Sequence, residues 1–326
     1  EDHGGKFSHY LYATYYDAFW ELPGSISAAA MEENPRQAVP YSIEGNASLS
    51  RIRKRVGVSQ RIRLTEKMSF VTSGYINQTE KTNPYGTSAF FNGFKDEAAE
   101  GWGARSEMRW RTGLGDYSSL ETIVGGEYQS EDNSLTEFTN DLGGPGGLKY
   151  SNQTTSTAYM AFANAVVNFR EKTLVDLGIS VNDSRFLNSG SSYAADEVYD
   201  LGIDLHLGSS YLPRVALSQQ LLPYLFAHGS VSYGHSYPSL FEMVDVASGA
   251  LNPNLRGESG VNYEGGLKFL STDQTTKAEV SLYQFDLKNS IIPQDNGLFA
   301  NAGKTDQSGL EASISHSIIW EEGGVI

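Results

Sequence analysis

The stretch LSRIRKRVGVSQRIRL, residues 49–64, decides the fold of this sequence. Arginines occupy one parity of it: Arg51, Arg53, Arg55, Arg61 and Arg63. Apolar residues occupy the other parity: Ile52, Val56, Val58, Ile62 and Leu64. Alternation with a period of two indicates a β-strand with one polar and one apolar face. At about 3.3 Å per residue this strand is roughly 50 Å long, far beyond the usual length of about 3–10 residues and typical of barrels that project from a membrane.

The same alternation recurs along the chain, in residues 102–112, 173–184, 199–207, 261–269 and 310–318. In a transmembrane barrel, apolar residues face lipid and the alternate polar residues face the lumen. We expect the following residues to face lipid: Trp102, Met108, Trp110, Val175, Leu177, Ile179, Val261, Leu267 and Phe269. We expect these to face the lumen: Arg105, Glu107, Arg109, Arg111, Asp176, Asn262, Glu264 and Glu311.

Short and long connections alternate between the predicted strands. Tight turns are expected at 65–67, 113–116, 170–172 and 271–274, and long polar loops at 21–44, 80–100, 131–152, 237–257 and 291–300. This asymmetry is typical of outer-membrane barrels and yields about 12 strands, with residues 27–33 as the only helical-looking stretch. A β-sandwich also alternates, but its strands are shorter, so we favour an antiparallel transmembrane β-barrel.

Composition excludes several classes of protein. The 326 residues include no cysteine, which rules out disulfides and thiolate metal sites. A net charge of −15 argues against a nucleic-acid-binding protein. No G-x-S-x-G, H-E-x-x-H, G-x-G-x-x-G or phosphate-loop signature occurs, so we expect neither an enzyme nor a bound cofactor. The histidines lack the spacing of a metal site, and we predict none: His3, His9, His206, His228, His235 and His316.

Ordered pieces between residues 224 and 316 resemble the later barrel of TonB-dependent outer-membrane receptors. The pieces are Tyr224-Leu225-Phe226-Ala227, Ser236-Tyr237-Pro238-Ser239-Leu240-Phe241-Glu242, Asn262-Tyr263-Glu264, Val280-Ser281-Leu282-Tyr283 and Gly309-Leu310-Glu311. Three further pieces are similar to loops of iron-complex receptors of this family: Leu22-Pro23-Gly24, Asn34-Pro35-Arg36-Gln37-Ala38 and Tyr85-Gly86-Thr87.

The resemblance implies a bacterial outer-membrane location and a barrel of 22 strands with a plugged lumen. Residues 1–326 are then expected to form part of one barrel domain, with the plug domain and terminal strands absent. The implied function is uptake of a chelated iron complex of the siderophore or ferric citrate type. The implied partners are the TonB energy-coupling protein, acting through the plug, the iron chelate and outer-membrane lipid. Two alternatives stay open: a passive or structural barrel such as a porin or adhesin, and an importer of a non-iron ligand such as a glycan or cobalamin.

Two groups of residues are candidates for contact with a ligand. Aromatic and basic residues at the loop ends are common in binding sites: Arg36, Tyr85, Phe90, Phe91, Trp102 and Tyr237. The second group is a basic wall that we expect to face the lumen: Arg51, Arg53, Arg55, Arg61, Arg63, Arg105, Arg109 and Arg111. Guanidinium groups pair well with carboxylates, so the wall either steers an anionic chelate or contacts the plug.

Overall fold

The computed structural model describes residues 6–88, 92–194, 197–243, 252, 255–294 and 298–317. Its main strands are β1 (Phe7–Glu21), β2 (Ser48–Arg63), β3 (Met68–Thr87), β4 (Asn92–Gly113), β5 (Ser119–Asp141), β6 (Gly144–Phe169), β7 (Thr173–Ala194), β9 (Ile203–Leu222), β10 (Leu225–Ser236), β11 (Glu258–Leu270), β12 (Thr276–Lys288) and β15 (Lys304–His316). The short strands are β8 (Glu197–Asp200), β13 (Ile291–Pro293) and β14 (Phe299–Asn301). Three short helices lie in the connections: α1 (Ala28–Glu33), α2 (Pro40–Glu44) and α3 (Leu240–Met243). None of the helices in these ranges is long and apolar enough to cross a membrane.

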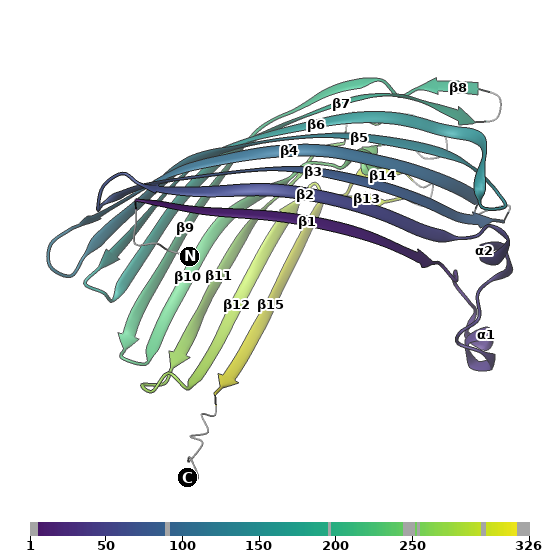
Figure 1. Ribbon diagram of the computed structural model, residues 1–326. Helices are drawn as coiled ribbons and strands as arrows, with labels where there is room; N and C mark the ends of the chain where they lie inside the picture. The colour runs from purple at the N-terminus through teal and green to yellow at the C-terminus, as the bar shows by residue number, and fades with distance from the viewer. Residues whose placement is uncertain are drawn as a thin grey trace, which may run out of the picture.

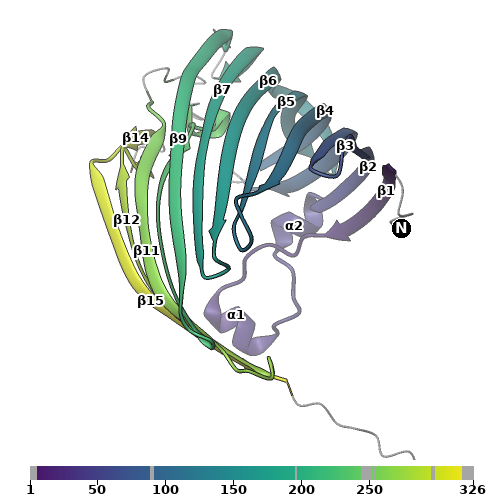
Figure 2. The same cartoon turned by 90° about the vertical axis from the view of Figure 1, so that its left-hand side faces the viewer.

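The strands form one antiparallel sheet in which each main strand pairs with its neighbours in the sequence. The order runs from β1 to β15, with β8 attached to β7 and with β13 and β14 as a separate ribbon. The sheet curves into an open trough, with β1 and β15 at its two edges (Figures 1 and 2). The predicted antiparallel all-β fold with about 12 strands is confirmed, and the sheet is not closed.

The structure excludes the sandwich alternative. A sandwich buries the apolar faces of two sheets against each other. Here large apolar residues of the strands are exposed, for example Trp110 at 52% and Val124 at 52%. The apolar residues that are buried in the described part of the chain are few and scattered: Ala47, Phe94, Leu201, Met243 and Leu255.

Two of the predicted long loops are wrong, because residues 80–100 and 131–152 are largely strand. Asn83 pairs with Lys95 across β3 and β4, and Leu135 pairs with Asn152 across β5 and β6. The glycine-rich run at 143–147 is a tight turn at Leu142 and Gly143, both with positive φ, followed by the start of β6. Where a strand extends beyond the membrane, both of its faces meet water. The sequence of such an extension therefore needs no alternation of polar and apolar residues, and the pattern does not predict a strand there.

The segment between β1 and β2 keeps its predicted character as a long connection. Ser27 caps α1 by accepting a hydrogen bond from the Ala30 amide, as expected for the helical-looking stretch 27–33. No sequence pattern predicts α2, whose C-terminal Gly45 carbonyl accepts a hydrogen bond from Asn140 of β5. Both helices lie at the end of the trough opposite the tight turns, within its C-shaped outline (Figures 1 and 2).

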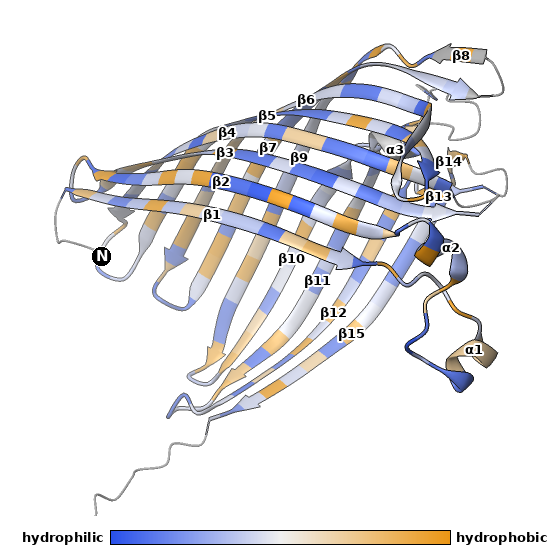
Figure 3. Cartoon of the chain, turned by 45° about the vertical axis from the view of Figure 1, so that its right-hand side comes forward, coloured by the Kyte–Doolittle hydropathy of each residue, from blue (hydrophilic) through white to orange (hydrophobic). Residues whose placement is uncertain are grey.

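The strand register separates the two predicted sets of residues onto opposite faces. Arg61, Val71 and Glu107 share one row on the arginine face, which is the face that carries the basic wall. Ile62, Phe70 and Met108 form the adjacent row on the other side, which we call the outer face. The same alternation of hydrophilic and hydrophobic residues runs along the later strands in Figure 3.

Aromatic residues mark the limits of an apolar belt on the outer face. Trp102, Tyr128 and Tyr159 stack in sequence, with ring centroids 4.8 and 5.0 Å apart. Trp110 lies eight residues further along β4 on the same face. Those eight residues extend about 26 Å, or about 20 Å in height for a strand tilted by roughly 40°, which approaches the belt of about 25 Å in outer-membrane barrels.

Candidate functional site

Three arginines of β2, which we call the distal cluster, line a cavity on the arginine face: Arg51, Arg53 and Arg55. The cavity has a volume of about 490 Å³ and receives residues from six consecutive strands, β2 to β7. One cavity can touch six neighbouring strands only on the inside of their curve, so the arginine face is the concave face of the trough.

The distal cluster has no carboxylate partner among the described residues. Arg53 donates a hydrogen bond to the Thr79 hydroxyl, with an N–O distance of 3.4 Å, and the Arg55 guanidinium lies 5.6 Å from the ring centroid of Tyr75. The Nε of Arg51 is buried and has no hydrogen-bond partner. Unpaired guanidinium groups beside a cavity form a site for an anion.

The rest of the cavity lining is polar and mostly uncharged. Lys81 and Glu97 pair with each other at 2.6 Å, which leaves Glu131 as the other carboxylate of the lining. Amides and hydroxyls supply the remaining polar groups: Asn77, Thr79, Asn133, Ser134, Asn152, Thr154 and Ser156. The cavity therefore combines a net positive charge with many neutral groups that can bind oxygen atoms.

The later arginines of the basic wall are neutralised by glutamates. Arg105 contacts Glu107 at 3.1 Å and Glu127 at 3.3 Å, and Arg109 donates to Glu107 at 2.7 Å. Arg111 donates to Glu121 at 3.0 Å. These three arginines lie on the arginine face as predicted, but their charge is held within the strands rather than offered to a ligand.

Two more arginines lie near the tight turns. Arg61 and Arg63 line a smaller cavity of about 250 Å³ together with Lys67, Arg109 and Arg111. Neither Arg61 nor Arg63 has an ion pair among the described residues. The unpaired arginines of the wall thus lie towards the two ends of β2, and the neutralised Arg109 shares the row of Arg63.

Of the loop residues, Arg36 and Tyr85 lie at the end of the trough opposite the tight turns. Arg36 is exposed between α1 and α2, and its backbone amide donates to Asn34. The Tyr85 hydroxyl donates to Glu137 at 2.6 Å, and the Lys95 amine lies 5.4 Å from the centroid of the Tyr85 ring. Lys149 also donates to Glu137, at 2.8 Å. Tyr85 is therefore held by its neighbours rather than free to follow a ligand.

The Glu137 cluster lies beyond the aromatic belt and contains a perturbed carboxyl group. Burial alone would raise the pKa of Glu137, but hydrogen bonds from Lys149 and Tyr85 and the charge of Lys95 bring it below its ordinary value. Burial and the adjacent carboxylate raise the pKa of Tyr85, so its phenol stays a donor.

This cluster makes the ends of β5 and β6 sensitive to acid. A carboxyl whose pKa is lowered by folding stabilises the folded state above its ordinary pKa, and that contribution is lost as the pH falls through the lowered value. We expect the amides around Glu137 to lose hydrogen-exchange protection as the pH falls below the ordinary pKa of a glutamate, after correction for intrinsic exchange. In Glu137→Gln this pH dependence should disappear, and a wild-type response in that variant would contradict the assignment.

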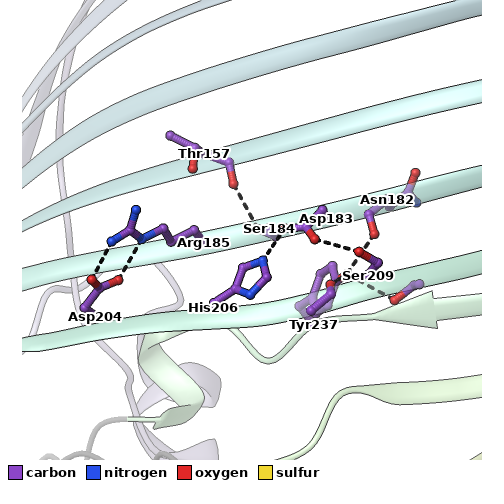
Figure 4. A network of polar contacts seen from close by, with 11 residues as sticks. Thr157, Asn182, Asp183, Ser184, Arg185, Asp204, His206, Ser209 and Tyr237 are labelled. Carbon is purple, nitrogen blue, oxygen red and sulfur yellow. Dashed lines mark hydrogen bonds and ion pairs between the residues drawn. The ribbon is translucent and has the colours of Figure 1, made fainter.

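Tyr237 is also engaged by the protein. Its hydroxyl donates to the Gly208 carbonyl at 2.6 Å and lies 3.1 Å from the Ser210 hydroxyl (Figure 4). Gly208 has a φ of 78°, next to the register shift between β7 and β9. This tyrosine ties the chain that leaves β10 to that irregular point, which gives it a structural role.

The remaining members of the loop group are Trp102, Phe90 and Phe91. Trp102 lies on the outer face and is 48% exposed, in agreement with its predicted lipid-facing position and not with the ligand-binding interpretation. Phe90 and Phe91 lie outside the described residues. In the described part of the chain, no group of three or more histidine, aspartate or glutamate side chains is arranged to hold a metal ion.

Sequence reasoning missed several cavity residues because they are polar but not charged. Asn152 donates to Thr154 at 3.2 Å, and Thr154 donates to Asn188 at 2.6 Å. All three are buried, and they continue the rows of Arg51 and Arg53 across the sheet. The signal available in the sequence was their parity, since they occupy alternate positions of their strands as the arginines do.

Comparison with known proteins identifies the family. The model of the family described as TonB dependent receptor-like, beta-barrel matches residues 4–325. The structure is similar to the ferric-catecholate import receptor Fiu of E. coli K12 in its closed form, with a TM-score of 0.72, 12% identity and coverage of 97% of this chain and 54% of that one. It is also similar to the ferric citrate transporter FecA in its unliganded form, with a TM-score of 0.73, 17% identity and coverage of 94% and 45%.

The siderophore receptor PiuA from Acinetobacter baumannii is a third similar structure, with a TM-score of 0.69, 10% identity and coverage of 96% and 52%. At these identities the likeness shows the fold alone, and the chain spans about half the length of these structures. No curated protein matches the sequence. The family model covers nearly the whole chain and confirms the resemblance seen in the sequence. The chain belongs to the TonB-dependent receptor β-barrel family, whose members are outer-membrane proteins of Gram-negative bacteria.

Proposed function

We propose that this chain is part of an outer-membrane receptor that takes up an anionic iron chelate with energy supplied through TonB. The observation that carries the proposal is the distal cluster of Arg51, Arg53 and Arg55, which faces a polar cavity without carboxylate partners. Retaining unpaired cations in a protein of net charge −15 is consistent with an anionic ligand at that place. The names of the similar structures, which include a ferric citrate transporter and a ferric-catecholate import receptor, support iron chelates as the ligand class.

The proposed path runs along the arginine face. A chelate enters at the end that carries α1 and α2, and it meets the distal cluster first. The neutralised arginines around Glu107 and the unpaired Arg61 and Arg63 follow, so a second positive surface lies near the turn between β2 and β3.

Growth under iron limitation tests the proposed function. A strain deleted for the gene and a strain restored with the full-length gene are supplied with one chelate at a time: ferric citrate, ferric 2,3-dihydroxybenzoate or an uncharged ferric hydroxamate. We expect the restored strain alone to grow on an anionic chelate, and only when TonB is functional. Growth that persists without TonB would favour a passive barrel. Failure on all the chelates, with binding of a glycan or cobalamin by the purified receptor, would favour a non-iron importer.

A further inference from the structure

Two tyrosines lie across glycines on the concave face, directly beside the distal cluster. Tyr12 of β1, Gly57 of β2, Tyr75 of β3 and Gly103 of β4 occupy one row of the sheet. A Cβ atom at Gly57 would lie 2.3 Å from the Tyr12 ring, and one at Gly103 would lie 2.7 Å from the Tyr75 ring. Each ring therefore covers a neighbouring glycine, and together Tyr12 and Tyr75 form what we call the tyrosine shelf.

The shelf is joined to the positive charge of the cavity. Arg55 lies one row away on the same face, and its guanidinium is 5.6 Å from the centroid of Tyr75. Tyr16 pairs with Arg53 and is 48% exposed, and Tyr10 lies 6.2 Å from Tyr12 by ring centroids. The concave faces of β1, β2 and β3 thus present tyrosine rings and guanidinium groups side by side.

This pairing favours one chemical class of anion. The flat face of a tyrosine stacks on another aromatic ring, and arginine binds both anionic oxygens and aromatic faces. A chelate built from catecholate or phenolate groups offers a planar ring and anionic oxygens at the same time. A chelate built from aliphatic carboxylates can form the same ion pairs with the arginines, but it has no aromatic ring to stack on the tyrosine shelf.

We propose that the tyrosine shelf selects an iron chelate whose iron-binding groups are aromatic, catecholate or phenolate, over one built from aliphatic carboxylates. This inference rests on the proposed function and specifies its ligand. Tyr12 and Tyr75 are the residues that determine the selectivity, and the distal cluster supplies the attraction common to both kinds of chelate.

The sheet contains a matched control for the structural role of such a ring. Tyr283 of β12 covers Gly309 of β15 in the same manner, since a Cβ at Gly309 would lie 2.5 Å from the Tyr283 hydroxyl oxygen. That pair is several strands away from every arginine of the basic wall. Replacing Tyr283 removes the same kind of contact from the sheet without touching the proposed site.

The test compares two chelates on the full-length receptor in detergent. The probes are ferric 2,3-dihydroxybenzoate and ferric citrate, and the variants are Tyr12→Leu, Tyr75→Leu, Tyr75→Phe and Tyr283→Leu. We expect each of the first two to weaken binding of ferric 2,3-dihydroxybenzoate about tenfold, or about 1.4 kcal/mol, while changing binding of ferric citrate less than twofold, because each removes a ring on which the aromatic chelate stacks. Tyr75→Phe keeps the ring and should bind as the wild type does, and Tyr283→Leu should change neither affinity.

Two results would overturn the selectivity. One is that Tyr75→Leu lowers the affinity for both chelates equally, which would give the ring a structural role only. The other is that Tyr12→Leu and Tyr75→Leu both bind the chelates as the wild type does. If the wild-type receptor binds neither chelate, the proposed function fails and this inference with it. That outcome is seen before any variant is made, so the two failures are distinguishable.

Discussion

Replacing Arg53 and Arg55 together by glutamate should weaken binding of ferric 2,3-dihydroxybenzoate to the full-length receptor by at least about 100-fold. Both guanidinium groups line the cavity without a carboxylate partner, so their reversal turns attraction into repulsion at short range. Loss of a close charge contact costs about 2–5 kcal/mol, and 100-fold corresponds to about 2.7 kcal/mol. Equilibrium binding at several salt concentrations measures the effect, which should be largest at low salt.

The matched control is the reversal of Arg61 and Arg63 on the same strand and the same face. It changes the charge of the protein by the same amount, about 26 Å further along β2 at about 3.3 Å per residue. We expect the affinity of this variant to stay within about threefold of wild type, because charges so far apart are screened at physiological salt. Equal losses in the two variants would mean that the whole wall acts through its field and that the cavity is not the site.

Replacing Val215 of β9 by arginine should destabilise the folded receptor by about 2–4 kcal/mol, the cost of an arginine near the middle of the lipid face. Val215 is 51% exposed on the outer face, between Tyr211 and Leu221, which lie near the two limits of the apolar belt. Its row on that face contains Leu177 and Val231, so an arginine there has apolar neighbours and lipid around it.

The adjacent residue gives the control. Ala216 lies on the concave face opposite Asp176, two residues from Arg214 of the same face. An arginine at 216 gains a carboxylate neighbour and water, so we expect Ala216→Arg to stay within about 1 kcal/mol of wild type. Reversible unfolding by denaturant in lipid vesicles measures both variants. A larger loss for Ala216→Arg than for Val215→Arg would place lipid on the wrong face of the sheet.

The facing of the strands could be predicted from the sequence because a membrane imposes opposite requirements on alternate residues. Arg109 and Met108 are neighbours in the chain, and in a transmembrane barrel one of two such neighbours faces the lumen and the other faces lipid. Where the strands leave the apolar belt, that requirement ends. Lys95 and Glu137 pair across β4 and β5, in residues whose sequence pattern predicts two polar loops. Only the backbone pairing in the structure shows that these residues form strands.

The basic wall could be predicted from the sequence. Which of its arginines have a carboxylate partner could be predicted only in part. Glu107 lies between Arg105 and Arg109 on one strand, a spacing of two that already predicts a contact. Glu127 reaches Arg105 only through the register of β4 and β5, which no local pattern reveals. The opposite holds for Arg53 and Arg55, whose cross-strand neighbours are Thr79 and Asn77 and carry no charge. The tyrosine shelf was missed for the same reason, since its two rings come from different strands.

The row of rings and glycines also bears on how the sheet assembles. Each main strand follows its partner in the chain, and at most of the connections adding a strand closes only a short loop and costs little chain entropy. Strands that are added one after another in this way can pair in the wrong register. A slip of β1 by one residue would turn every side chain to the wrong face. A slip by two would bring Tyr12 against Arg55 or Ser59, where a side chain stands in place of Gly57. The tyrosine that covers a glycine thus favours the native register of the two strands that carry the pair, here β1 and β2.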